Sequence, residues 1–201
     1  FVTRPNEKVP DRAQLGLAPA EEAVNGIYLL RKPRGKGEGT IVLQESAATY
    51  AFIEEALPLI DKDGLDLWIY HVSSAELFGM LPPAKQQRIF PEERAREAMG
   101  ITGFTLPTMY RWIHSDLGLS MSLHPFRKGH FLGSGQGYMV LAEAGLDGKS
   151  QYQAVKKLLE ALRRAVKAAP QAAAARPAAK AAVRTVARRK AQPKAKVRRR
   201  R

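Results

Sequence analysis

The sequence is 201 residues long and contains no cysteine and only four histidines. Without cysteine, the chain can form no disulfide, no thiolate metal site and no cysteine nucleophile. It also has no run of about 18 apolar residues, so we expect no membrane-spanning helix and no membrane partner. The absence of cysteine fits a reducing compartment, and we expect a cytoplasmic location.

The common catalytic signatures are missing as well. There is no Gly-x-Ser-x-Gly elbow and no Walker phosphate loop. The run Gly133-Ser-Gly-Gln-Gly137 resembles a dinucleotide fingerprint in its glycine spacing alone, because no strand with a ribose-binding acidic residue follows it. His124 and His130 flank a loop without a carboxylate, so the loop lacks the ligands of a metal site. We therefore predict no catalytic, cofactor-binding or metal-binding residue in this chain.

Acidic residues are absent from positions 168–201, which hold 12 of the 33 lysines and arginines. The rest of the chain carries the other 21 basic residues against 19 acidic ones, so this tail supplies most of the net charge of +14. Alanine, proline, lysine and arginine dominate the tail, which has too few large apolar side chains to offset its chain entropy by burial. We predict that the tail is disordered.

The basic tail indicates an affinity for polyanions. Each cation that meets a phosphate of duplex nucleic acid steepens the log–log salt dependence of binding by roughly 0.9. We predict non-specific nucleic-acid contacts at Arg188, Arg189, Lys190, Arg198, Arg199, Arg200 and Arg201. A purely solubilising appendage is the alternative interpretation.

Strand and helix patterns alternate along the rest of the chain. Short apolar runs typical of strands occur at 27–30, 40–43, 65–72, 101–104 and 119–123. Apolar residues at helical spacing occur at 46–60, 75–81, 106–114, 136–144 and 150–166. This alternation favours parallel strands joined by crossover helices. We predict a three-layer α/β fold with a mostly parallel five-stranded sheet and flanking helices.

Serines precede or open several of these helices. We expect Ser46 to cap the helix after strand 40–43 and Ser150 to cap the last helix, because serine oxygens accept the unpaired N–H groups at a helix start. Glu45 lies just past the same strand, and we interpret it as a solvated or capping group.

A glycine-rich basic loop connects the predicted strand 119–123 to the helix 136–144. The start of a helix carries free N–H groups and a partial positive charge, which attract anions. We therefore predict a candidate anion site formed by Arg127, Lys128, His130, Ser134 and Gly135. Close packing of strand and helix through the glycines is the alternative interpretation.

Taken together, these elements resemble the C-terminal domain of transketolase-like, thiamine-diphosphate-dependent enzymes. The matching segments are Gly26-Ile-Tyr-Leu-Leu30, Gly39-Thr-Ile-Val-Leu43, Gly64-Leu-Asp-Leu-Trp-Ile-Tyr-His-Val-Ser-Ser74, Glu76-Leu-Phe78, His124-Pro-Phe126, Gly133-Ser-Gly135 and Ala144-Gly-Leu-Asp147. Residues 1–4 resemble the end of the preceding domain of the family. Two features depart from the family pattern: Glu45 replaces a small residue, and the loop between Phe126 and Gly133 is longer.

The resemblance implies three regions: the end of an upstream domain and a linker over 1–25, the α/β domain over 26–167, and the tail over 168–201. It implies a homodimeric parent enzyme that transfers ketol groups. The upstream domains would hold thiamine diphosphate and Mg²⁺, with neither bound by this fragment, which would stabilise the dimer. Two alternatives stay open: a domain of a 2-oxo acid dehydrogenase component, and a nucleic-acid-binding protein that uses the basic tail.

Overall fold

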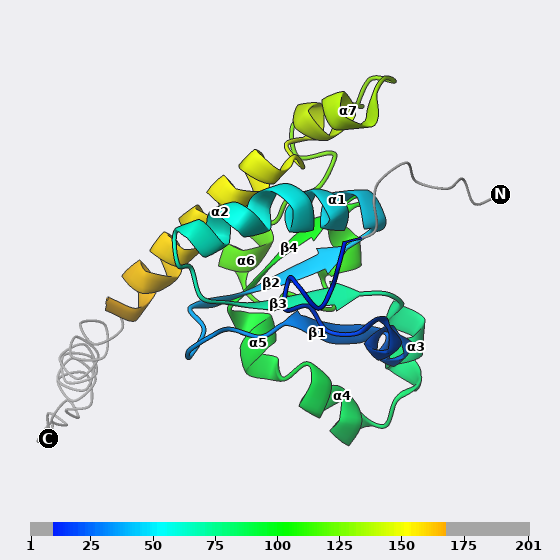
Figure 1. The fold of residues 1–201 in the computed structure, drawn as a ribbon, viewed down its shortest axis with the longest axis vertical. Helices are drawn as coiled ribbons and strands as arrows, with labels where there is room; N and C mark the ends of the chain where they lie inside the picture. Colours follow the sequence, from blue (N-terminus) through cyan, green and yellow to red (C-terminus); the bar gives the residue numbers. More distant parts are fainter. Residues whose placement is uncertain (1–9, 168–201) are drawn as a thin grey trace, which may run out of the picture. The chain divides into compact units, whose positions relative to one another are not determined.

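The computed structural model describes residues 10–167, and those up to Leu162 belong to one compact unit. Within the described range, four strands form one sheet: β1 (Ile27–Arg31), β2 (Gly39–Gln44), β3 (Leu67–Val72) and β4 (Ala98–Thr102), in the order β1-β3-β2-β4 (Figure 1). β2 runs parallel to β3 and β4, whereas β1 is antiparallel to β3. The predicted α/β class is confirmed, with a mixed sheet of four strands in place of five. The tail and its predicted nucleic-acid contacts lie outside the described residues.

β2 is the central strand and is buried along almost its whole length. Ile41 is aligned with Ile69 on β3 and with Met99 on β4, and these three side chains belong to one apolar cluster. The next residue, Val42, belongs to the cluster on the other face. A strand covered on both faces has no polar side, which explains why its sequence is a continuous apolar run.

Helices cover both faces of the sheet (Figure 1). One face packs against α1 (Ser46–Ala51), the π-helical turn η2 (Phe52–Ala56), α2 (Leu57–Lys62) and the helical residues 148–162. The other face packs against α3 (Ala75–Met80), α4 (Pro83–Ile89), α5 (Glu92–Arg96) and η3 (Leu106–Met109). The remaining elements are η1 (Ala20–Asn25), α6 (Asp116–Met121) and α7 (Gly137–Ala144). Among the helices between residues 10 and 167, none has the length and apolarity that crossing a bilayer requires.

The predicted fifth strand, over residues 119–123, is a helix followed by a single bridge. Ser115 caps α6 by accepting the N–H of Gly118 at 3.1 Å, and Ser122 Oγ donates to the carbonyl of Gly118 at 2.7 Å. The Ser115 cap stabilises the helical start of this segment, where alternating leucine and serine had suggested a strand. Leu123 alone pairs with β4, through one parallel bridge.

Acidic residues, rather than the two predicted serines, cap α1 and the last helix. The Glu45 carboxylate accepts the N–H groups of Ala47 at 2.7 Å and Ala48 at 3.0 Å. Asp147 lies just before the last helix and accepts the N–H of Ser150 at 3.0 Å. A carboxylate forms stronger hydrogen bonds than a hydroxyl and also interacts favourably with the positive end of the helix dipole.

The substitution Gly118→Ala tests the packing of α6 on β4. A Cβ at position 118 would lie 1.9 Å from the carbonyl oxygen of Ala98, which belongs to the backbone of a buried strand. We expect the substitution to lower the free energy of unfolding by about 1–3 kcal/mol or more, as over-packing does. Chemical denaturation followed by circular dichroism measures this change. Gly135→Ala is the matched control, because a Cβ there meets nothing within 4 Å; equal losses in the two variants would contradict the packing.

Candidate functional site

The carboxyl ends of β2, β3 and β4 lie along one edge of the sheet, here called the carboxyl edge. The antiparallel strand β1 begins at the same edge, where the carbonyl of Gly26 accepts the N–H of Ser73 at 2.9 Å. From this edge β2 continues into α1 on one face, whereas β3 and β4 continue into α3 and η3 on the other. Open α/β sheets bind ligands where neighbouring connections diverge in this way, so a site is expected here.

Polar side chains at the carboxyl edge bond to one another and to the backbone. Gln44 Oε1 accepts hydrogen bonds from Thr102 Oγ1 at 3.1 Å and Thr108 Oγ1 at 2.8 Å, which join the ends of β2 and β4. Glu45 has a left-handed backbone with φ of 78°, and its carboxylate caps α1. Gly103 packs directly against the Glu45 side chain, because a Cβ at position 103 would lie 2.4 Å from Glu45 Oε2. The capping role expected for Glu45 is confirmed, and these groups hold strand and helix ends together.

Two histidines near this edge, His71 and His124, are partly buried. His71 packs edge-to-face against Tyr28, with ring centroids 5.6 Å apart. Burial, and secondarily the Arg12 guanidinium, lowers the pKa of His71 to about 4. Burial, followed by the charge of Arg127, also lowers the pKa of His124. Both rings are therefore neutral at pH 7, and the Nδ1 atom of each is buried without a hydrogen-bond partner.

His71 gives the folding stability a pH dependence of defined sign. Between its folded pKa of about 4 and the ordinary value of 6.5, the unfolded chain binds a proton that the folded chain does not. Stability therefore falls as the pH is lowered through this window, by at most roughly 3 kcal/mol from this group. His71→Phe keeps an aromatic ring and removes the titration.

We expect His71→Phe to flatten the curve of unfolding free energy against pH in this window, as measured by denaturant titration at a series of pH values. His130→Gln is the control, because His130 is exposed and its replacement leaves His71 in place. A slope that survives unchanged in His71→Phe would show that other groups cause the pH dependence.

The five residues of the predicted anion site lie in the exposed loop before α7: Arg127, Lys128, His130, Ser134 and Gly135. The cationic side chains among them contact oxygen atoms of the protein. Arg127 Nη2 donates to the carbonyl of Ser120 at 3.1 Å. Lys128 Nζ contacts the carbonyl of Glu143, and His130 Nε2 lies 3.6 Å from Glu143 Oε1. An anion would have to compete with these contacts, and the anion site stays a prediction.

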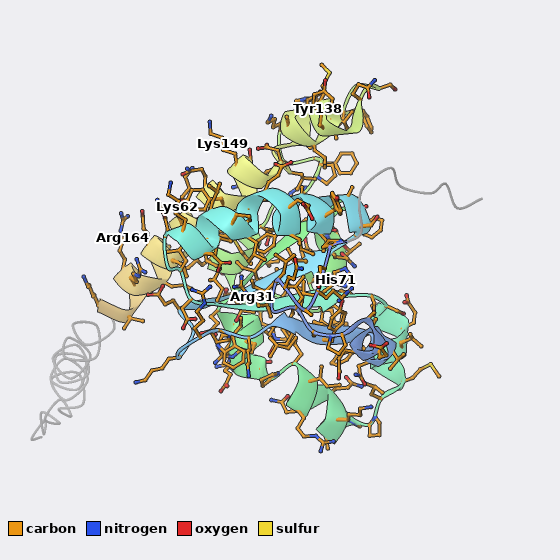
Figure 2. All side chains as sticks on the ribbon, viewed as in Figure 1. Arg31, Lys62, His71, Tyr138, Lys149 and Arg164 are labelled. Carbon is orange, nitrogen blue, oxygen red and sulfur yellow. The ribbon has the colours of Figure 1, made fainter. Side chains whose placement is uncertain are left out.

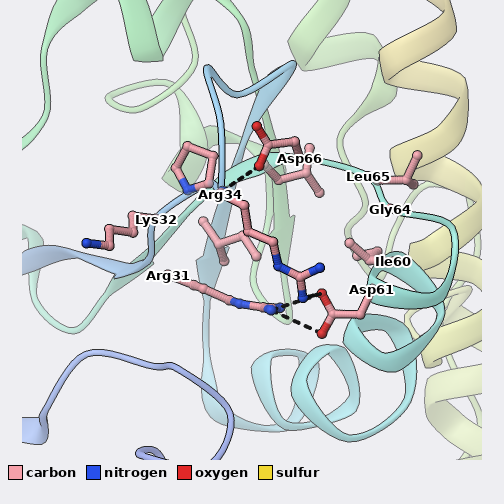
Figure 3. Close-up of a pocket in the computed structure, with 11 residues that line it drawn as sticks. Arg31, Lys32, Arg34, Ile60, Asp61, Gly64, Leu65 and Asp66 are labelled. Atoms are coloured by element: carbon pink, nitrogen blue, oxygen red, sulfur yellow. Dashed lines mark hydrogen bonds and ion pairs between the residues drawn. The ribbon is translucent and has the colours of Figure 1, made fainter.

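A cleft of about 240 Å³ opens at the opposite edge of the sheet, beside the turn between β1 and β2 (Figure 3). Asp61, near the end of α2, pairs with Arg31 at 2.9 Å and with Arg34 at 3.1 Å. Figure 3 shows both guanidinium groups directed at this one carboxylate. Three of the charges that line the cleft, Arg31, Arg34 and Asp61, are therefore paired with each other.

Asp66 fixes the turn at this cleft. Its carboxylate accepts the N–H groups of Arg34 at 2.6 Å, Gly35 at 3.0 Å and Gly37 at 2.9 Å. Burial alone would raise the pKa of Asp66, but the three backbone donors outweigh burial and hold the pKa below its usual value. Sequence reasoning missed this cluster, because the carboxylate lies 29 to 32 residues beyond the amides that it binds. No local pattern contains both partners.

Several transketolases of known structure share this arrangement of strands and helices. The transketolase of Leishmania mexicana matches with a TM-score of 0.53 and 15% identity, over 71% of this chain and 19% of its own. The transketolase of Campylobacter jejuni matches with a TM-score of 0.50 and 20% identity, over 66% of this chain and 18% of its own. A transketolase mutant from Pichia stipitis matches with a TM-score of 0.52 and 16% identity, over 75% of this chain and 20% of its own. No protein-family profile and no curated protein sequence matches the chain.

The fold is therefore that of a transketolase-like α/β domain. The resemblance inferred from the order and spacing of the elements is confirmed at this level. The chain spans about a fifth of the length of the transketolases that it matches.

Proposed function

We propose that this chain is the C-terminal, dimer-stabilising domain of a cytoplasmic, transketolase-like ketol transferase that depends on thiamine diphosphate. The proposal is supported by the structural likeness to transketolases, which covers 66 to 75% of the chain. Because the chain spans about a fifth of those enzymes, the catalytic domains of the parent would lie outside it. The role of this domain would then be to pack against them and support the dimer.

Thiamine diphosphate and its Mg²⁺ do not fit the described residues of this chain. Mg²⁺ is held by oxygen ligands, usually one or two carboxylates with phosphate oxygens. The carboxylates of Glu45 and Asp66 are occupied by backbone N–H groups, and that of Asp61 by two arginines. Between residues 10 and 167 there is no group of three His, Asp or Glu side chains that could hold a metal ion. In this proposal, other domains of the parent hold the cofactor.

The full-length protein that contains this sequence tests the proposal. We expect thiamine diphosphate and Mg²⁺ to be required for ketol transfer from a ketose phosphate to an aldose phosphate. Removal of residues 26–167 removes the dimer-stabilising domain, so light scattering after gel filtration should show a monomer. Removal of 168–201 is the control and should leave the dimer intact. Cofactor-independent turnover, or a dimer that survives the loss of 26–167, would refute the proposal.

A 2-oxo acid dehydrogenase component is the alternative within the same resemblance. The two departures from the family pattern, Glu45 and the longer loop between Phe126 and Gly133, bear on the substrate class. Release of CO₂ from a 2-oxo acid, without ketol transfer from a ketose phosphate, would select this alternative.

Nucleic-acid binding is a candidate of a different class, favoured by the 12 lysines and arginines and the lack of acidic residues in the tail over 168–201. If duplex binding is the function, removal of this tail should abolish it. Fluorescence anisotropy with a duplex of arbitrary sequence measures the binding, and the slope of log affinity against log salt should be roughly −0.9 for each phosphate contact. An enzyme would instead keep its turnover after the same truncation.

A further inference from the structure

A second cleft, of about 370 Å³, lies where α4 and the start of α5 border strands β1 and β3 (Figure 1). Its volume is at the lower end of the range for small-molecule sites, about 300–1,000 Å³. The strands contribute Tyr28, Leu29, Trp68 and Tyr70, and η1, α4 and the start of α5 contribute the other lining residues. It shares no lining residue with the cleft around Asp61. We call it the α4/α5 cleft.

Tyr70 reaches the α4/α5 cleft with a hydroxyl that has no hydrogen-bond partner among residues 10–167. Its ring is held edge-to-face against Phe90, with the ring centroids 4.9 Å apart. Only 3% of Tyr70 is exposed, yet the hydroxyl is not one of the polar atoms that are sealed from solvent without a partner. The small exposed part of the residue therefore includes the hydroxyl. A polar atom of a bound molecule would supply the hydrogen bond that the protein does not.

The Tyr70 hydroxyl keeps its proton over the physiological pH range. Burial raises the pKa of Tyr70 to about 12, and the charge of Arg94, which acts in the opposite direction, does not offset it. A neutral phenol donates one hydrogen bond and also accepts. The hydroxyl can therefore bond either a donor or an acceptor on a molecule that enters the cleft.

Apolar groups line much of the cleft. Leu29 and Trp68 come from the strands, and Ile89 comes from the end of α4. The indole of Trp68 is held in place, because its Nε1 donates to the carbonyl of Lys36 at 3.3 Å and the Arg94 guanidinium lies 4.8 Å from the ring centroid. Apolar and aromatic walls around a few polar groups are typical of sites for small organic molecules, and aromatic rings pack well against such walls.

Four charged side chains line the cleft: Glu22, Arg88, Glu93 and Arg94. Arg94 pairs with Glu93 at 3.3 Å and also with Glu97. The Glu22 carboxylate accepts a hydrogen bond from Asn25 Nδ2 at 3.1 Å. The Arg88 guanidinium, exposed on α4, has neither an ion pair nor a hydrogen bond within the described part of the chain. A guanidinium group binds a carboxylate or a phosphate through paired hydrogen bonds, so Arg88 favours an anionic ligand.

We propose that the α4/α5 cleft is a binding site for a small aromatic carboxylate or phosphate. The aromatic ring packs against Trp68, the anionic group binds the Arg88 guanidinium, and the Tyr70 hydroxyl bonds a polar atom elsewhere on the ligand. The site does not depend on the proposed function, because none of its residues was used to argue for a transketolase-like parent.

Proton–nitrogen correlation NMR of the 201-residue chain tests the site, because the sequence contains two tryptophans and each gives its own indole N–H signal. The probe is para-hydroxybenzoate. We expect it to shift the Trp68 signal in a saturable way. The Trp112 signal should not shift, because Trp112 is 1% exposed and does not line the cleft. The titration gives the dissociation constant at this site, separately from any binding to the basic tail.

The substitution Arg88→Gln tests the recognition of the anion. It should raise the dissociation constant of para-hydroxybenzoate about fivefold, the effect of losing a partly exposed ion pair. It should leave the constant of the uncharged para-hydroxybenzyl alcohol unchanged. Lys62→Gln is the control for the loss of one positive charge. Figure 2 shows Lys62 at the end of α2, on the side of the sheet away from α4.

The substitution Tyr70→Phe tests the hydroxyl and keeps the buried ring. It should raise the dissociation constant of para-hydroxybenzoate about threefold or more, the effect of losing one hydrogen bond. Benzoate lacks the second polar group, so its constant should not change. Tyr110→Phe is the matched control, because Tyr110 is exposed and lies outside the cleft.

Weaker binding of para-hydroxybenzoate in both variants, with both controls like the wild type, supports the site. A Trp68 signal that neither para-hydroxybenzoate nor phenyl phosphate shifts saturably overturns it. Binding that neither substitution weakens overturns it as well, and an Arg88→Gln variant that binds the alcohol and the anion equally poorly overturns the assigned ligand class. Circular dichroism checks folding, and Arg88→Gln decides if Tyr70→Phe is not folded. None of these measurements involves ketol transfer or dimer formation, so a failure here leaves the proposed function standing.

Discussion

The parallel pairing of β2 with a strand on each side is the constraint on which the rest of the structure depends. Neighbouring parallel strands must be joined by crossover connections, and helices accordingly separate β2 from β3 and β3 from β4. The connection from β2 to β3 and the connection from β3 to β4 run in opposite directions across the sheet, and their helices lie on opposite faces, each with its own apolar cluster. The ends of β2, β3 and β4 consequently meet at one edge, where Gln44 and Thr102 come within hydrogen-bond distance.

The two edges of the sheet have taken on different properties. At one edge, charged groups pair among themselves around Asp61 and Asp66. At the carboxyl edge, polar groups bond internally, and Glu45 caps a helix instead of meeting a ligand.

β1, β2 and β3 were predictable from the sequence because buried strands give short apolar runs, whereas β4 was expected at 101–104 and lies at Ala98–Thr102. α7 was predictable for a different reason: its end at Gly145 has φ of 72°, a conformation that glycine adopts readily and other residues avoid. α6 was missed because leucine and serine alternate over too few residues to distinguish period 2 from a single helical turn, and the cap at Ser115 was overlooked.

The candidate site was less predictable than the fold. The capping role of Glu45 is local and was foreseen, whereas the hydrogen bond between Thr102 and Gln44 joins residues 58 positions apart. Asp66 and its turn were hidden for the same reason.

The carboxylate of Asp66 has a consequence for the motion of the chain. The turn at Arg34, Gly35 and Gly37 is glycine-rich and exposed to solvent, and its composition is that of a mobile loop. Yet one side chain ties down three of its amide groups, and that side chain is anchored at the start of a buried strand. These amides can exchange with deuterated water only when their hydrogen bonds to the Asp66 carboxylate break. Their protection factors therefore measure how often this turn unfolds locally.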